Sequence, residues 1–463
     1  MPFTTFMPGI IEALLVTYDA NVGIPVGVNL ACSRPHSQDC SVLPQPDDEN
    51  LDLARRSGVA LRVGQLSLSS GTGSYRVKAS MARIAAALGI DRHEAHVTLT
   101  EITTTSHRGQ LFRTEVRQVR NVGVNTERLA ELEWLAQRVE ARPGWTVEEV
   151  EAEVDAIERK PPLYPVPLNA LWAAIACAAF AFLNNGGPAE IAGAFVGAYL
   201  GQGLRRLAMN RGFNTFGVAT VAAALASVTY LGFVELLHVA GLTSGVHEAG
   251  YASAALFLVP GFPLVTGVLD LAKLDFSAGL ARLTNALMIL ISAAFAVWAV
   301  SILVGLSPDP PDPMALGVVA VTVARAVASA VGVLGFALMF NSPWRMALAA
   351  AAITTVPNVL RIAAVEYSHW PAQAAAAGGA FLVGLLTAWI APRLNLPRIT
   401  VYVPAVTIMV PGVPAYRAVY YLSNGDITQA MSYGVSAALV VAALAIGLGA
   451  ARMLTDRDWG FES

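Results

Sequence analysis

The sequence predicts an α-helical polytopic membrane protein, with about ten transmembrane helices as a 5+5 inverted repeat and a small α+β cytoplasmic N-terminal domain. Hydrophobic residues form 55% of the 463-residue chain and charged residues only 14%, whereas soluble chains average about 25% charged residues. Nearly all charge runs precede Pro161, and long apolar runs follow it. Two of these apolar runs share one proline-containing motif, which predicts that the membrane region contains a repeat.

Prolines mark the boundary between the two regions. Residues 161–166 contain Pro161, Pro162 and Pro165 and are predicted to be a linker, because clustered prolines cannot continue a helix. Residues 1–46 are expected to be a poorly ordered tail. They do not read as a signal peptide, because no basic residue precedes the apolar stretch and Glu12 interrupts it.

The polar region, residues 47–160, is predicted to be the α+β domain. Its final helix has a clear start, because Thr146 followed by Glu149 forms a capping-box pattern. Helices are expected at 51–66, 75–88, 125–139 and from Trp145 onward, and strands at 96–103 and 110–119.

Ten apolar runs after the linker are each long enough to cross a bilayer, which takes about 20 residues. They divide into a first repeat, 167–304, and a second repeat, 315–452, with a cytoplasmic tail at 453–463. The expected spans are 167–184, 190–208, 215–238, 250–269, 279–304, 315–339, 344–363, 372–391, 399–420 and 428–452.

The distribution of basic residues supports this topology. If the polar domain is cytoplasmic, alternate loops should carry the Lys and Arg residues. The loops expected on the cytoplasmic side, together with the C-terminal tail, carry Arg205, Arg206, Arg211, Lys273, Arg345, Arg393, Arg398, Arg452 and Arg457. The loops expected on the other side, 184–190, 238–250 and 306–314, contain neither Lys nor Arg. Both termini are therefore expected in the cytoplasm.

A Val-Pro-Gly-X-Pro motif occurs once in each repeat. It spans 259–263 in the fourth run and 410–414 in the ninth, an offset that also maps Asp275 onto Asp426. Because each half holds five spans, an odd number, the second half is expected to be inserted upside down relative to the first. This inverted design is common among secondary transporters.

The two motifs are predicted to break their helices near the middle of the membrane. Proline removes a helical hydrogen bond, and the freed polar groups are costly in lipid unless protein or a water-filled cavity satisfies them. Each motif could be a simple kink, but two matching motifs in matching spans favour a substrate-binding or gating site. The residues assigned to it are Pro260, Gly261, Pro263, Pro411, Gly412 and Pro414.

Several short motifs resemble those of the threonine/serine exporter family. They are GSYRV at 73–77, MARIAAALGI at 81–90, LVPGFPL at 258–264 with Asp270, and GLAR at 279–282. The resemblance covers roughly residues 50–452. It implies export of threonine and serine across the plasma membrane, driven by the proton motive force. Split relatives of this family are associated with other small acids, so export of a dicarboxylate is the alternative substrate reading.

Two polar residues in the second half are candidates for substrate binding. Arg325 lies within an apolar span, where a charge is costly and usually functional. Its guanidinium suits a substrate carboxylate, although an ion pair with an acid on another helix explains it equally well. Asn358 follows Pro357 and could line a cavity at a second kink.

Three charged residues are candidates for coupling or gating. Glu235 could carry a coupled proton, but its place near the outer end of a span favours an interfacial carboxylate. Asp270 and Arg282 flank a cytoplasmic loop, and a salt bridge that closes the loop is their simpler role. If that bridge breaks during transport, both roles hold together.

The sequence argues against several other functions. A net charge of −3 argues against nucleic-acid binding, and the three cysteines have no metal-ligand spacing. No cofactor is expected. A hydrolytic N-terminal domain is a second hypothesis, although the domain shows no nucleophile elbow or HExxH motif, and a channel is a third. The expected partners are threonine or serine, protons and the lipid bilayer. The sequence leaves open whether the protein forms a homo-oligomer.

Overall fold

The computed structural model describes residues 46–119, 122–243, 250–304, 317–456 and 459. From Asp47 onward they belong to one compact unit. The predicted tail lies outside the described residues except for Pro46, and so do 306–314 and most of the final residues. The separation of 47–160 as a domain therefore stays a prediction.

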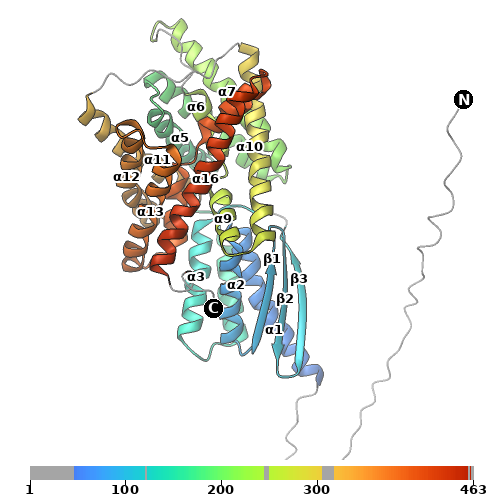
Figure 1. Cartoon of the computed structure of the whole chain (residues 1–463). Coiled ribbons are helices and arrows are strands. Elements are labelled where there is room, and N and C mark those ends of the chain that lie inside the picture. The colour runs from blue at the N-terminus through green and yellow to red at the C-terminus, as the bar shows by residue number, and fades with distance from the viewer. Residues whose placement is uncertain (1–45, 120–121, 244–249, 305–316, 457–458, 460–463) are drawn as a thin grey trace, which may run out of the picture. The chain divides into compact units, whose positions relative to one another are not determined.

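The polar region consists of four helices and one three-stranded antiparallel sheet, in the order β1-β2-β3. β1 packs against α2, and Figure 1 places the sheet beside α1 and α2 at one end of the apolar helices. The elements are α1 (Pro46–Ser69), α2 (Ser74–Ala87), β1 (Arg92–Val97), β2 (Glu101–Arg108), β3 (Leu111–Gln118), α3 (Thr126–Ala141) and α4 (Val147–Arg159).

The strand predicted at 96–103 is wrong. A hairpin turn divides that segment, because the Thr98 amide donates to the Glu101 carbonyl at 2.8 Å. The threonine-rich sequence alternates on both sides of this turn, so its periodicity conceals the break. The capping box is confirmed: the Glu149 amide donates to Thr146 Oγ1 at 3.2 Å, and the Thr146 amide donates to Glu149 Oε2 at 3.0 Å.

The apolar region begins at Val166, where the predicted linker ends, and is helical in every predicted span. In chain order the elements are α5 (Val166–Leu183), α6 (Pro188–Asn210), α7 (Thr215–Val239), α8 (Tyr251–Ala254), η1 (Leu256–Leu258), α9 (Gly261–Ala272), α10 (Phe276–Val304), α11 (Val318–Met339), α12 (Trp344–Glu366), α13 (Ala372–Ile390), η2 (Pro392–Leu394), α14 (Arg398–Thr407), α15 (Gly412–Ser423) and α16 (Ile427–Thr455).

Within the described residues, seven of these helices are long and apolar enough to cross a membrane, and an eighth span results if α14 and α15 count as one. The chain is therefore a polytopic membrane protein. α6 and the short apolar helix over 256–272 fall outside the seven. The count of ten stays a prediction.

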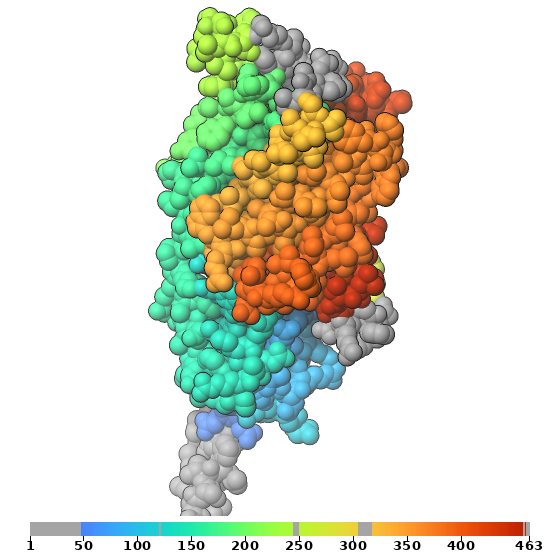
Figure 2. Space-filling view, turned by 90° about the vertical axis from the view of Figure 1, so that its left-hand side faces the viewer, coloured from blue at the N-terminus to red at the C-terminus, as the bar shows by residue number. Residues whose placement is uncertain are grey.

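Exposed side chains on these helices indicate a lipid-facing surface. On α11, Val319, Val323 and Val327 are 78%, 59% and 58% exposed. Residues four apart share one helix face, so they form an apolar stripe. The helix belongs to the surface drawn in gold and orange in Figure 2. Such a stripe is unfavourable in water and suits the acyl chains of a bilayer.

The helices of the two halves pack in matching pairs. α5 packs on α6 as α11 packs on α12, α7 packs on α10 as α13 packs on α16, and α9 packs on α10 as α15 packs on α16. Contacts between the halves also correspond, since α10 meets α15 and α16 meets α9. Even the helix ends agree: Asn185 after α5 has φ 65° and Asn341 after α11 has φ 64°.

Candidate functional site

The two Val-Pro-Gly-X-Pro motifs adopt the same backbone turn. Pro260 has φ −80° and ψ 59°, and Pro411 has φ −80° and ψ 65°. The Gly261 amide donates to the Val259 carbonyl at 2.8 Å, and the Gly412 amide donates to the Val410 carbonyl at 2.9 Å. Each motif is thus an inverse γ-turn. In the second half, α14 and α15 meet at an angle of 46°.

A new helix starts directly after each turn. α9 begins at Gly261 and α15 begins at Gly412. Pro263 and Pro414 occupy the first turns of these helices, where the backbone amide has no helical partner and proline is tolerated. The motif therefore ends one helix and starts the next, with the amides at the start of the new helix at the break.

The two breaks lie against each other. A Cβ atom added to Gly261 would lie 2.9 Å from Thr407 Cγ2, at the end of α14. A Cβ atom added to Gly412 would lie 2.7 Å from Leu256 Cδ1, in η1. Each glycine thus permits the start of its helix to approach the other half closely. The sequence predicted the two breaks, but their mutual contact follows only from the structure.

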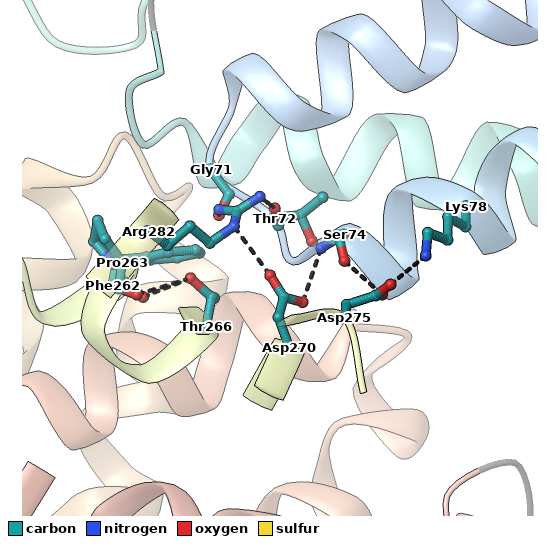
Figure 3. A network of polar contacts seen from close by, with 10 residues as sticks. All are labelled: Gly71, Thr72, Ser74, Lys78, Phe262, Pro263, Thr266, Asp270, Asp275 and Arg282. Atoms are coloured by element: carbon teal, nitrogen blue, oxygen red, sulfur yellow. Dashed lines mark hydrogen bonds and ion pairs between the residues drawn. The ribbon is translucent and has the colours of Figure 1, made fainter. Parts of the chain in front are cut away.

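A buried ion pair follows the first break and reaches the polar region (Figure 3). Asp270 is 0% exposed and Arg282 is 1% exposed, and Arg282 Nε lies 3.0 Å from Asp270 Oδ2. The guanidinium also donates to the backbone carbonyl of Thr72 at 2.6 Å and that of Gly71 at 3.4 Å. The predicted pair therefore forms, and it joins α9 and α10 to the loop before α2.

Asp270 caps a helix that belongs to another part of the chain. The N-cap of α2 is Gly73, which has no side chain to accept a hydrogen bond. The Ser74 amide donates instead to Asp270 Oδ1 at 2.9 Å, which satisfies one of the free amides of the first turn and places a negative charge at the positive end of the helix. A Cβ atom at position 73 would lie 2.8 Å from that oxygen, so glycine makes room for the carboxylate.

Asp275 strengthens the same junction. The Ser74 hydroxyl donates to Asp275 Oδ2 at 2.6 Å, and Lys78 forms an ion pair with Asp275 (Figure 3). Gly71, which starts the loop, has φ +100°, a conformation that only glycine adopts readily. The first half is thereby attached to the start of α2 through charged groups.

A second junction attaches the polar region to the other half. The amide and hydroxyl of Thr126, at the start of α3, donate to the Phe340 carbonyl after α11 at 3.0 and 3.2 Å. Asn341 donates from Nδ2 to Asn125 Oδ1 at 2.9 Å and accepts from the Leu163 amide at 2.8 Å. Ser74 at the start of α2 thus binds the first half, and the start of α3 binds the second.

Arg325 forms an ion pair with an acidic residue on another helix, the second of the two alternatives considered for it. It is 6% exposed, forms an ion pair with Glu366 and donates to Asn185 Oδ1 at 3.2 Å. Sequence reasoning missed Glu366 as its partner, because the two residues lie on helices whose contacts the sequence does not specify.

Asn358 is buried and joins two helices. Its Nδ2 donates to Ser329 Oγ at 2.8 Å, and its Oδ1 accepts from Arg361 Nε at 2.9 Å. Arg361 forms no ion pair with a described residue. The sequence could have pointed to Arg361, because it is a charged residue in an apolar run, one turn after Asn358. Glu235 is exposed on α7, so the structure does not bring it into these networks.

No cluster of three His, Cys, Asp or Glu side chains that could hold a metal ion occurs within the described ranges.

Comparison with known proteins decides the class. The family described as "Putative threonine/serine exporter" matches residues 58–304, more than half of the chain, and the family described as "Threonine/Serine exporter, ThrE" matches residues 325–454. The chain belongs to the threonine/serine exporter family. It is therefore a membrane transport protein and not an enzyme. The two matches divide the chain where the predicted repeats divide.

Three known proteins are similar to the chain at low identity. The threonine/serine exporter of Corynebacterium glutamicum is 25% identical over 86% of this chain and 82% of its own length. The probable threonine/serine exporter of Mycobacterium tuberculosis is 26% identical over 88% and 77%. The probable succinate transporter subunit YjjP of Escherichia coli is 27% identical over 52% of this chain and 93% of its own length. No solved structure matches the chain.

We predict that Asp270→Asn and Arg282→Gln each destabilise the purified protein, because each leaves a buried group of the other sign without its partner, at a cost of about 3–5 kcal/mol. The double variant Asp270→Asn/Arg282→Gln should lose less than the sum of the two. The measurement is the melting temperature in detergent for all four proteins. Additive losses would contradict direct pairing.

Arg159→Gln is the matched control for this cycle. Arg159 pairs with Asp155 one turn earlier, and its side chain is 79% exposed, so its removal should cost about 1 kcal/mol or less.

Proposed function

We propose that this protein is a secondary transporter that exports threonine, serine or similar small polar amino acids across the plasma membrane, driven by the proton motive force. Membership of the exporter family supports amino-acid export. The observation that carries the mechanism is the mutual contact of the two inverse γ-turns. Two helix starts at one crossing point provide backbone donors for a substrate carboxylate, the arrangement found in carriers with broken helices.

The 5+5 inverted repeat is part of this proposal. It is supported by the matching helix pairs, by the matching turns and by the left-handed Asn185 and Asn341 at equivalent helix ends. In a carrier of this design, one half rocks against the other and opens the central site to each side in turn. Glycine at 261 and 412 would let the two halves slide closely past each other.

The Asp270–Arg282 pair is our candidate for coupling. Among the described residues of α5 to α16, only Glu190 and Asp270 are buried carboxylates. Protonation of Asp270 would remove its attraction for Arg282 and weaken its hold on the first turn of α2. The end of α9 would then be released from α2, and α9 begins at the first break. A proton could thus change the position of the broken helix.

Arg325 is proposed to bind the substrate carboxylate at another stage of transport. Its guanidinium is already paired with Glu366, whose side chain is 39% exposed. A substrate carboxylate would therefore have to replace Glu366, which joins the ion-pair role and the binding role in one cycle. Asn358 would support this exchange through Ser329, whose hydroxyl donates to the Arg325 carbonyl at 2.7 Å.

Export of a dicarboxylate is the second candidate function. Its support is the similarity to the probable succinate transporter subunit YjjP, which covers half of this chain. The matches to the two threonine/serine exporters cover 86% and 88% of this chain and favour the first candidate.

The cytoplasmic placement of both termini is proposed from the basic residues of the loops, which gather at the end where α2 lies.

The test of function is efflux from proteoliposomes loaded with labelled threonine, serine or succinate, with and without an imposed pH gradient. We expect threonine and serine to leave faster when the gradient is present, and an uncoupler to abolish the difference. Efflux that ignores the gradient would exclude proton coupling. Efflux of succinate alone would establish the second candidate.

Gly261→Ala and Gly412→Ala should each lower the rate of threonine efflux by about tenfold or more, since overpacking a close contact costs about 1–3 kcal/mol and tenfold corresponds to about 1.4 kcal/mol. Gly378→Ala on α13 is the control, because a Cβ atom there meets nothing within 4 Å. Equal rates in all three variants, at equal protein levels, would refute the role of the breaks.

Arg325→Ala should abolish threonine efflux while the protein still inserts into the membrane. Glu366→Gln tests the proposed exchange, because it leaves the guanidinium without its resident carboxylate and should retain binding of labelled threonine. Normal efflux from a well-inserted Arg325→Ala variant would remove Arg325 from the mechanism.

A further inference from the structure

A cavity of about 1130 Å³ lies between the polar region and the ends of the apolar helices. Its walls come from α2 and α3 on one side, and from α16 and the segment before α14 on the other. Cationic side chains outnumber acidic ones in this wall by seven to three. The cavity therefore favours an anionic group, because a recess lined by one sign of charge concentrates ions of the opposite sign.

Most of the cations in the wall already have acidic partners. Lys78 pairs with Asp275, Arg83 with Glu133, and Arg138 with Glu153. Arg76 differs, because it forms no ion pair with any described residue. Its Nε donates to Tyr75 Oη at 2.8 Å and its Nη2 to Tyr402 Oη at 3.5 Å. Burial raises the pKa of the Tyr75 phenol, so that hydroxyl stays neutral.

Arg452 of α16 lies beside Arg76 at the same phenol. It donates a hydrogen bond to Tyr75 Oη and stacks over the rings of Tyr75 and Trp459, at 5.1 and 4.3 Å. The residue is only 7% exposed, and its Nε finds no acceptor among the described residues. Its Nη2 donates to Asp456 Oδ2 at 3.3 Å, so one of its donors is held in an ion pair. A buried guanidinium with an unused donor is able to bind a further acceptor.

We propose that this cavity is the docking site for the carboxylate of the transported substrate on the side of the membrane where α2 lies, with Arg76 and Arg452 as its ligands. The inference rests on the proposed function and names a residue set outside the two breaks. Two guanidiniums with free donors suit a carboxylate, which accepts paired hydrogen bonds. Tyr75 holds both guanidiniums in place between them.

The position of the site connects it to both halves. Arg76 reaches Tyr402 on α14, the helix that ends at the second break. Two residues before Arg76, Ser74 binds Asp270 and Asp275, at the end of the helix that begins at the first break. A carboxylate bound to Arg76 would therefore change the charge balance between the two broken segments before substrate reaches them.

Kinetics of the full-length protein test this site. Arg76→Gln and Arg452→Gln should each raise the KM for threonine supplied on the side of α2 by about tenfold, the loss expected for one charge-assisted contact, with kcat changed far less. Arg138→Gln, in the same wall but on an exposed ion pair, should leave KM within about twofold. Arg76→Lys keeps the charge and should restore part of the affinity.

Equilibrium binding in detergent gives an independent readout. Acetate, a carboxylate without the amino group, should compete with labelled threonine for the wild-type protein and compete much less for Arg76→Gln. If both glutamine variants transport threonine at the wild-type rate and with an unchanged KM, the docking site is overturned, while the proposed function is left intact. A wild-type protein that transports none of the three substrates would refute the proposed function itself. If Arg76→Gln fails to insert, Arg452→Gln and Arg76→Lys decide the outcome.

Discussion

The need to satisfy backbone polar groups inside lipid is the constraint on which the rest of this structure depends. Proline at 260 and 411 removes a helical donor in the middle of an apolar segment, and an unsatisfied carbonyl there costs several kcal/mol. At each break the γ-turn satisfies one carbonyl and one amide, and the two breaks pack against each other, with Gly261 beside Thr407 and Gly412 beside Leu256. Gly261 is buried at this contact, whereas Gly412 is half-buried. The contact brings one helix start from each half together.

The polar region contacts both halves through hydrogen bonds and ion pairs, and α3 also joins the apolar core through Leu129 and Ala130. Asp270 of the first half caps α2, and Asn341 of the second half binds the start of α3. Hydrogen bonds and ion pairs of this kind can be exchanged for others. These polar contacts also explain why Arg282 can be buried, since its guanidinium donates to a backbone carbonyl of the polar region.

The sequence predicted features that depend on neighbouring residues, but it did not predict contacts between residues far apart in the chain. Features set by neighbouring residues were predicted, such as the capping box of Thr146 and Glu149 and the helical nature of each apolar run. The strand at 96–103 failed because a turn at Thr98 sits inside an unbroken alternation. Arg325 could not be assigned from sequence, because its partner Glu366 lies 41 residues away on a neighbouring helix. Arg76 belonged to a motif recognised in the sequence, but its unpaired charge depends on which side chains surround it.

By itself, the sequence determined that this protein enters a membrane, that its family exports amino acids, and that two apolar segments are broken at matching positions. These properties follow from composition, short motifs and proline chemistry, which act over a few residues. Only the tertiary structure decided that the two breaks meet, that Asp270 caps α2 and that Arg76 and Arg452 share one cavity. Those features join residues that lie far apart in the chain, and their proximity results from how the helices of both halves pack. The breaks were thus a local prediction, and the site they form is a property of the fold.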